Sequence, residues 1–436
     1  MNVLLVSTMV PGAPSGVRVH YERLAAGLRQ LGHTVTVLTP ASVPMWQSRC
    51  WGVPCRVLSW CGPLGRHLSV ELHCCANIYS AFDRRAVYDV VNAQDATTGW
   101  LLRWLLGPRV PVVVTGHFND HPGQEVVQQM GLNGQAARLV MRWHSFFLGR
   151  TEHFLSVSGY VQRRVAPLLS ADARHVMVPH GLALREFAAV SAHVGLLERA
   201  AGRPVLLNIG HLEGRKNQGF LLAVAKALWA LRPDFLLVLV GAGPDEALLR
   251  ARIASAGLEN VVWLAGPHVE VAPLLRASTL YVHAALNESF GLVLLEAMAC
   301  EVPVLALSTG AVPEVLDHDP EALFAPTITA TALAVRLHQL LSEPAAQARL
   351  QRRQYAYAAT HFDLSAMLAG TVAAYEGARQ AGAAPASASA QPDQSAQPDQ
   401  SAQPAQSAQP AQPAQPGQPA QPGQAVQPVG VSSSAL

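Results

Sequence analysis

The feature that most constrains the fold is a repeated alternation of short apolar runs and longer helical patterns. Runs rich in valine and leucine recur between about residues 1 and 380, and segments with helical periodicity separate them. Continuous apolar runs are typical of strands buried on both faces, and intervening helices indicate a parallel sheet. The sequence therefore predicts an α/β protein with doubly wound sheets.

The alternation occurs in two series. The first predicted strands lie at 2–8, 33–38, 87–91, 110–115, 154–156 and 175–178. The pattern weakens between about 183 and 202, restarts with PVLLNIG, and continues through FLLVLVGAG, VVWLAG, TLYVHA and VPVLAL. We therefore expect an N-terminal Rossmann-like domain, a linker and a second Rossmann-like domain, at 1–185, 186–203 and 204–362.

The C-terminal part departs from this pattern. Residues 363–381 are predicted to form a terminal helix that packs back on the N-terminal domain. Residues 382–436 repeat glutamine, proline and alanine with almost no large apolar side chains, so burial cannot offset the entropy of ordering them. We predict a disordered tail there.

Composition limits the class of function. The chain has 436 residues, of which half are apolar and 14% are charged, with a formal net charge of +2. This balance argues against a dedicated nucleic-acid binder. No apolar run is long enough to span a membrane, and the first residues read as a strand rather than a signal peptide. We therefore expect a cytoplasmic protein with reduced thiols.

Several polar or glycine residues directly follow predicted strands. They are Gly16, His117, His211, Gly241 and Glu288. Ligands of open parallel sheets bind beyond the carboxyl ends of the strands. These positions are therefore candidates for one ligand site.

The stretch NESFGLVLLEAM holds two carboxylates in an otherwise apolar run. Glu288 precedes a predicted helix start and Glu296 lies inside that helix, while the backbone N–H groups of Phe290, Gly291 and Leu292 can receive an anion. Carboxylates also accept hydrogen bonds from sugar hydroxyls, so a sugar, diphosphate and ribose would match this order. A helix cap at Glu288 and a structural salt bridge at Glu296 remain the alternative.

This stretch resembles the E-x(7)-E signature of the large retaining GT-B glycosyltransferase family, family 4 group 1, which includes bacterial mannosyltransferases and glycogen and sucrose synthases. Segments similar to other family motifs occur in the same order: VSGYVQRRV, VPHGLALREF, IGHLEGRKNQ, LVGAGPDEALLR and TGAVPEVL. The resemblance extends from about residue 1 to 380. It implies a GT-B fold, in which two Rossmann-like domains face a cleft.

The resemblance also implies roles for individual residues. Glu288 would contact hydroxyls of the donor sugar and Glu296 those of the ribose. Lys216 would bind the diphosphate and stabilise the departing nucleotide. Gly16 would approach the donor phosphates, and His117 would lie near the donor sugar and the acceptor.

Some positions depart from the family pattern. His211 stands where arginine is usual, and Arg215 is a nearby source of positive charge. Ser15 replaces the first glycine of the N-terminal loop, and His180 replaces an asparagine. His268 is expected to lie near the nucleotide base.

The implied reaction is retaining transfer from a nucleotide sugar to a hydroxyl of a glycan or lipid-linked acceptor, in cell-envelope or exopolysaccharide synthesis. No cofactor or metal is expected, because the cationic side chain and the helix N–H groups take the place of a metal. A catalytically silent protein that binds nucleotide sugars is the alternative.

Two further segments have open interpretations. The segment CWGVPCRVLSWCGPLGRHLSVELHCC holds five cysteines with His67 and His73, but lacks the usual zinc spacing, so packed thiols without metal are expected. The basic, aromatic segment ARLVMRWHSFFLGR is predicted to bury Leu139, Trp143 and Phe147 as a core stripe. Peripheral contact with the inner membrane face is the alternative.

Overall fold

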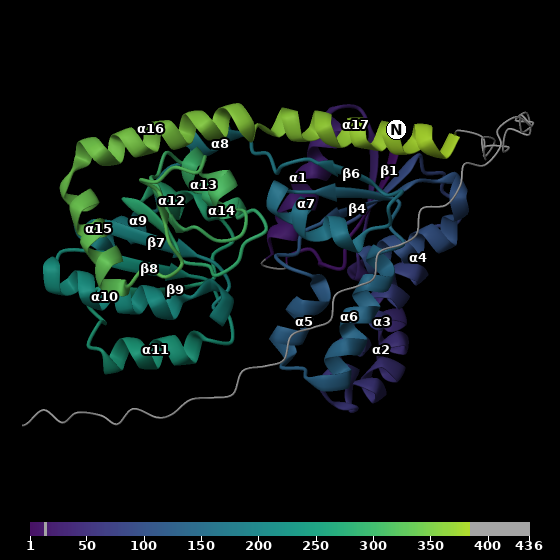
Figure 1. Cartoon of the computed structure of the whole chain (residues 1–436), viewed down its shortest axis with the longest axis horizontal. Helices are drawn as coiled ribbons and strands as arrows, with labels where there is room; N and C mark the ends of the chain where they lie inside the picture. The colour runs from purple at the N-terminus through teal and green to yellow at the C-terminus, as the bar shows by residue number, and fades with distance from the viewer. Residues whose placement is uncertain (13–14, 384–436) are drawn as a thin grey trace, which may run out of the picture. The chain divides into compact units, whose positions relative to one another are not determined.

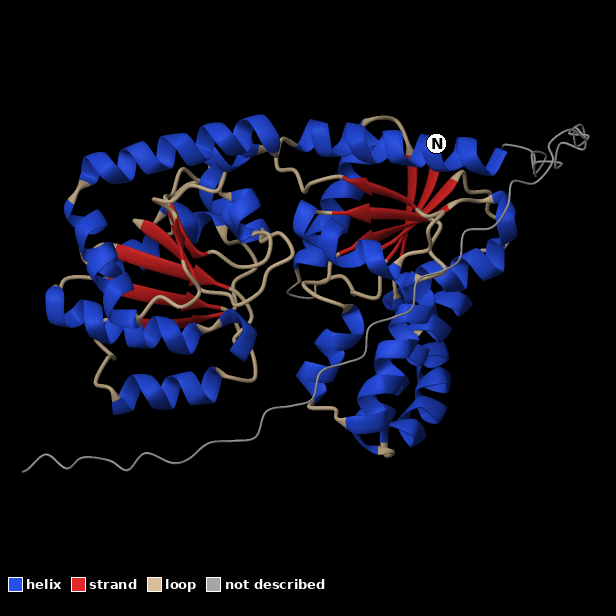
Figure 2. Cartoon of the chain, viewed as in Figure 1, coloured by secondary structure: helices blue, strands red, loops and turns tan. Residues whose placement is uncertain are grey.

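The structure is a computed structural model that describes residues 1–12 and 15–383, all within one compact unit. It contains two six-stranded sheets in which every strand pairing is parallel, each flanked by helices (Figures 1 and 2). The predicted fold class, two doubly wound α/β domains, is confirmed. The tail predicted over 382–436 lies outside the described residues from residue 384 onward.

The first sheet has the strand order β2-β1-β3-β4-β5-β6. Its strands are β1 (Asn2–Val6), β2 (Thr34–Leu38), β3 (Val90–Ala93), β4 (Val112–Gly116), β5 (His153–Ser156) and β6 (Arg174–Met177). The helices that pack around it are α1 (Gly16–Gln30), α4 (Ala96–Leu106), α7 (Gly159–Val165) and α17 (Leu364–Ala383). All six strands overlap the predicted ones, because most of them are apolar runs buried between helices, although β6 is largely exposed and β2 is buried on one side.

Two helical pairs extend the first domain. They are α2 (Met45–Ser59) with α3 (Gly62–Ala81), and α5 (Pro122–Met130) with α6 (Gly134–Leu148) (Figure 1). In α6, Phe147 is buried, but Leu139 is 57% exposed. The predicted core stripe is therefore wrong at Leu139, because α6 packs through Val140, Phe147 and Leu148 instead.

The second sheet has the strand order β12-β11-β10-β7-β8-β9. Its strands are β7 (Val205–Ile209), β8 (Leu236–Val240), β9 (Val262–Gly266), β10 (Leu280–His283), β11 (Val304–Leu307) and β12 (Leu323–Phe324). The sequence did not predict β12, because two residues are too few to show a strand pattern. The region expected as a linker holds two short helices, and Leu196 in the second of them is fully buried in the second core.

The remaining helices surround the second sheet or connect it to the first. They are α8 (Leu184–Ala188), α9 (Val194–Ala200), α10 (Gln218–Leu231), α11 (Glu246–Ser255), α12 (Ala272–Arg276), α13 (Leu292–Ala299), α14 (Val312–Val315), α15 (Ala330–Ser342) and α16 (Pro344–His361). Short 3-10 turns occur at η1 (Pro40–Ser42), η2 (Gly107–Arg109), η3 (Ala166–Leu168) and η4 (Gly214–Lys216).

The last helix, α17, packs on the first domain although it follows the second domain in sequence. Met367, Leu368 and Tyr375 join the core formed by β1, β3 and α1. The closest approach is at Gly27 of α1, where a Cβ atom would lie 2.5 Å from Leu368 Cδ1. The two helices touch here because Gly27 has no side chain.

The contact between α1 and α17 predicts that replacing glycine by alanine changes the free energy of unfolding in opposite directions at two helical positions. Gly377→Ala, in α17, meets open space and should raise the free energy of unfolding by about 1 kcal/mol through helix propensity. Gly27→Ala should lower it by about 1–3 kcal/mol, because the added methyl group displaces Leu368. Urea unfolding of both variants measures the difference, and equal effects would show that α1 and α17 are not in close contact.

Candidate functional site

The loop between β10 and α13 positions the two carboxylates singled out in the sequence. Gly291, directly before α13, has a φ of 85°, a left-handed conformation that favours glycine. A Cβ atom at Gly291 would lie 2.9 Å from Leu294 Cδ1, so a side chain does not fit either. The turn at this glycine places Glu288 in the loop and Glu296 inside the helix, and both carboxylates are buried.

Glu288 is paired with a cation from the same domain. Lys216 Nζ, from the turn after β7, lies 2.5 Å from Glu288 Oε2, and His283 Nε2 approaches the same oxygen to 3.5 Å. Burial alone would raise the pKa of Glu288, but the Lys216 ammonium and His283 lower it well below its usual value. Glu288 is therefore ionised at neutral pH and forms a buried ion pair with Lys216.

Glu296 is paired with a cation from the other domain. Arg23 Nη2, on α1, donates to Glu296 Oε1 over 2.7 Å. Burial raises the pKa of Glu296, and Arg23 opposes that rise. The salt bridge considered as the alternative for Glu296 is thus present, with a partner that sequence analysis did not identify.

The N-terminal loop lies against the start of α13. A Cβ atom at Gly16 would lie 3.6 Å from Leu292 Cδ1, so these two predicted donor-binding positions are neighbours. Ser15 Oγ accepts a hydrogen bond from Val17 N and caps α1. The replacement of glycine by serine at this position therefore has a local structural role.

His117 belongs to a cluster of three histidines. Its ring stacks on that of His180 with centroids 5.5 Å apart, and His20 lies 4.9 Å from His117 and 4.4 Å from His180. His117 Nε2 also lies 2.7 Å from Gln94 Oε1. Burial lowers the pKa of His117 to about 4, and burial, neighbouring histidines and Arg23 lower the pKa of His20 and His180. All three rings are therefore neutral at pH 7.

Backbone and side-chain bonds connect the His117 loop to the Glu288 loop. Ser289 N donates to Asn119 Oδ1 over 2.7 Å, and Ser289 Oγ donates to the His117 carbonyl over 3.1 Å. Ser158 Oγ, at the start of α7, donates to the Ser289 carbonyl over 2.7 Å. The carboxylate of Glu288 is thus held next to the loop that carries His117.

The other predicted donor-binding residues differ in their surroundings. Arg215 donates to the Asn287 carbonyl, and it also pairs with Glu213. Phe290 is buried, with its ring edge-to-face against His180. Within residues 1–12 and 15–383, no hydrogen bond or ion pair joins His211 or His268 to this group, and the His268 ring instead lies 5.7 Å from His193.

Sequence reasoning thus missed six polar partners of the site: His20, Arg23, Gln94, Asn119, Ser158 and His283. His20 and Arg23 lie on α1 one turn from each other, but their partners are far away in sequence. The only signal was the VSGYVQRRV segment, which marked the region of Ser158 without its partner.

Comparison with known proteins identifies two family models on the chain. "Glycosyltransferase Family 4" matches residues 14–186, and "Glycosyl transferases group 1" matches residues 197–359. Together these matches cover well over half of the chain, one for each domain.

Relatives with assigned activities have low to moderate identity. Phosphatidyl-myo-inositol mannosyltransferase of Mycobacterium leprae is 27% identical over 75% of this chain and 84% of its own length. D-inositol 3-phosphate glycosyltransferase of Kineococcus radiotolerans is 32% identical over 61% of this chain and 66% of its own length. N-acetyl-alpha-D-glucosaminyl L-malate synthase of Bacillus anthracis is 34% identical, but the match covers only 32% of this chain and 36% of the synthase.

Solved structures share the fold. Anabaena HepE in complex with UDP aligns over 86% of this chain and 100% of its own, with a TM-score of 0.61 and 18% identity. Sucrose-phosphate synthase of Thermosynechococcus elongatus aligns over 87% and 100%, with a TM-score of 0.67 and 18% identity. At this identity the likeness concerns the fold alone.

The histidine cluster predicts a loss of stability in acid. The unfolded chain takes up protons near pH 6.5, but His117 in the folded protein does so only near pH 4, so stability is full above pH 6.5 and falls as the pH drops toward 4. For His117 the loss is about 3 kcal/mol, from about 1.4 kcal/mol per pKa unit.

His180→Asn should reduce this acid loss, because it removes one of the buried titrating rings. The exposed His211→Asn is the matched control and should leave the pH dependence unchanged. Thermal unfolding midpoints between pH 5 and 7.5 measure the effect. Parallel curves for wild type and His180→Asn would contradict the assignment of buried neutral rings.

Proposed function

The chain belongs to the group 1 glycosyltransferases of family 4, and from this membership we propose that it is a retaining enzyme that transfers a sugar from a nucleotide-sugar donor to a hydroxyl acceptor. The observation that carries the proposal is the buried Lys216–Glu288 pair at the carboxyl ends of β7 and β10. The pair lies beside the start of α13 and the His117 loop. Ligands of open parallel sheets bind at this edge, beyond the carboxyl ends of the strands.

The pair suits a donor that carries both hydroxyls and a diphosphate. A buried ammonium and carboxylate neutralise each other when no ligand is bound, which limits their desolvation cost. On donor binding, Lys216 would move to the diphosphate and Glu288 would accept hydrogen bonds from sugar hydroxyls. Glu296 has its second oxygen, Oε2, for the ribose while Oε1 stays with Arg23.

The chemical step follows from charge placement. As the bond between sugar and diphosphate breaks, negative charge grows on the leaving phosphate, and Lys216 together with the first N–H groups of α13 stabilises it. The departing phosphate would take the acceptor proton on the face from which it leaves, which gives retention of configuration. These groups supply the charge stabilisation, so the proposal includes no metal or cofactor in the transfer.

His117 would act through a hydrogen bond rather than through charge. Burial keeps its ring neutral, so it cannot neutralise a phosphate at pH 7. With Nε2–H donated to Gln94 Oε1, its Nδ1 is an acceptor for a hydroxyl of the donor sugar or the acceptor. His117 would therefore orient a hydroxyl, and Gly16 would leave space for the phosphates.

The proposed acceptor is a hydroxyl of a glycan or lipid-linked molecule in cell-envelope or exopolysaccharide synthesis. Among the named relatives, the phosphatidyl-myo-inositol mannosyltransferase supports a lipid-linked acceptor, and the names of the other two refer to small hydroxyl compounds, inositol 3-phosphate and malate. For the donor, the crystallised HepE complex with UDP supports a nucleoside diphosphate sugar.

Activity should depend on the buried pair. Lys216→Met and Glu288→Gln should each lower kcat by about 10²–10³-fold, because each removes one stabilising contact in the transition state. Lys226→Met is the matched control: Lys226 is the only other lysine of the chain and is exposed on α10. Transfer and donor hydrolysis, measured with UDP-, GDP- and ADP-sugars, give the readout.

Equal turnover by the wild type and both site variants would contradict the assignment of the pair. Donor binding by the wild type without turnover on any acceptor would instead favour a catalytically silent binding protein.

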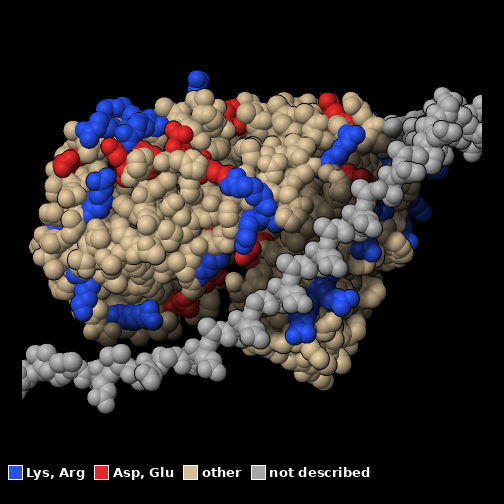
Figure 3. All heavy atoms as spheres, viewed as in Figure 1, with Lys and Arg blue, Asp and Glu red and all other residues tan. Residues whose placement is uncertain are grey.

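We also propose that the protein is cytoplasmic and that its first domain contacts the inner face of the membrane. Besides the segment of α6 for which this contact was considered, α2 and the residue after it support contact: Trp46 is 67% and Trp60 78% exposed, and arginines lie between them. On the visible face in Figure 3, basic side chains lie over the lower part of the first domain. Among the described residues, no helix is both long and apolar enough to cross a membrane.

Vesicle binding tests this surface. Trp46→Ser and Trp60→Ser should each weaken co-sedimentation with vesicles rich in anionic lipid about tenfold, because each removes an indole from the membrane interface. Trp229→Ser is the control, since Trp229 is a partly exposed tryptophan on α10 of the second domain. Binding that is equal for all four proteins, or independent of anionic lipid, would contradict the proposal.

A further inference from the structure

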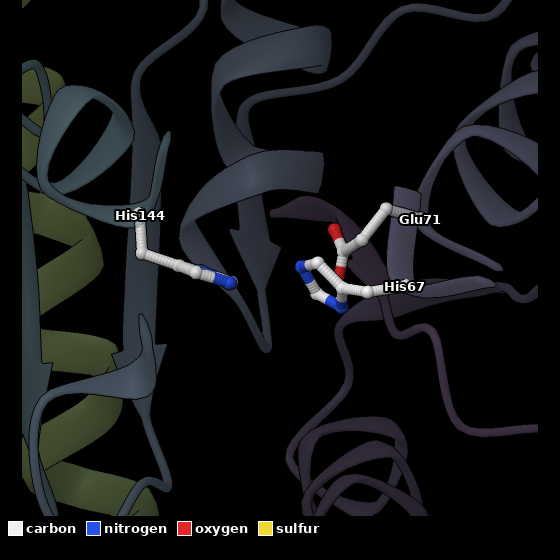
Figure 4. A group of neighbouring side chains, drawn as sticks. All are labelled: His67, Glu71 and His144. Atoms are coloured by element: carbon white, nitrogen blue, oxygen red, sulfur yellow. The ribbon is translucent and has the colours of Figure 1, made fainter. Parts of the chain in front are cut away.

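Three side chains with metal-binding atoms converge between α3 and α6, in a part of the molecule that the proposed transfer reaction does not use. His67 and Glu71 lie one turn apart on α3, and His144 approaches from α6. One ligand atom from each residue lies within 4.8 Å of the other two. Figure 4 shows both rings and the carboxylate pointing toward a common centre.

The two histidines lack the partners that buried rings require. His67 is only 5% exposed, and the Nε2 atoms of His67 and His144 are buried without a hydrogen-bond partner in the described part of the chain. A buried polar atom without a partner is costly, so such atoms are rare in native proteins. At His67 and His144 two such atoms lie beside one carboxylate, and a ligand between them would give both a partner.

The charge of this group also fits a cation. Imidazole nitrogens and a carboxylate oxygen are atoms that bind divalent transition-metal ions. Within the described ranges no lysine or arginine forms an ion pair with Glu71.

We propose that His67, Glu71 and His144 bind one divalent transition-metal ion, with Zn²⁺ as the expected ion. Two neutral imidazoles and one carboxylate form a ligand set that Zn²⁺ accepts, and three protein ligands leave a fourth position for water. The ion would connect α3 to α6 and supply a positive charge to the partly buried carboxylate of Glu71. This site is independent of the proposed transferase activity.

The nearby cysteines are not part of this site. All six cysteines are free thiols, and the group of converging ligand atoms includes no cysteine sulfur. The expectation of no metal in the cysteine-rich segment rested on cysteine spacing, and His144 could not be included because it belongs to a distant part of the sequence.

Metal analysis of the purified full-length chain tests the site. After chelator treatment and dialysis against Zn²⁺, wild type should retain about one ion per chain, and its thermal midpoint should rise with Zn²⁺. His144→Ala and the nearly isosteric Glu71→Gln should weaken binding by more than about 100-fold, beyond the loss expected for an outer-shell partner. His73→Ala and Cys74→Ser, on the same helix, should bind as wild type does.

Cobalt substitution identifies the ligands. Co²⁺ bound by nitrogen and oxygen should show ligand-field absorption without a thiolate charge-transfer band. No retained metal in wild type would overturn the proposal, as would a thiolate band or unchanged affinity in both His144→Ala and Glu71→Gln. Circular dichroism of the stripped variants confirms that they are folded, so a lost ion reports on the site itself.

Discussion

The constraint on which the site depends is that a buried carboxylate requires a cation nearby. The helix α13 and the loop before it hold two such groups, and the fold supplies one cation to each. Lys216 reaches Glu288 from within the second domain, and Arg23 reaches Glu296 from α1 of the first. Removing one partner of a buried pair typically costs 3–5 kcal/mol, so these pairs help fix how the loops meet.

Hydrogen bonds at Ser289 join the loop before α13 to the first domain. Ser289 is adjacent to Glu288 and is bound by Asn119, by the His117 carbonyl and by Ser158, all from the first domain. The loop that holds the candidate sugar-binding carboxylate is therefore also a bridge between the domains.

Two groups of buried histidines differ in what lies beside their rings. In the cluster of His20, His117 and His180, the rings pack on one another, and His117 has Gln94 as a partner, but His180 Nδ1 has none. At His67 and His144 the buried Nε2 atoms also have no partner. The second group differs from the first by the Glu71 carboxylate, which brings three metal-binding side chains together.

The fold class and most strands could be predicted from the sequence, because an apolar run buried between helices is a local pattern. Glu288, Lys216 and the glycine turn before α13 could be proposed as site residues, since they belong to segments that resemble a family, but their ion pair was not predicted. The folded structure was needed to show that Glu296 pairs with Arg23, 273 residues away, that His144 joins His67, and that Leu139 faces outward. Such contacts depend on how helices pack against one another after folding. Local periodicity does not indicate which distant side chain will lie next to a buried charge or imidazole.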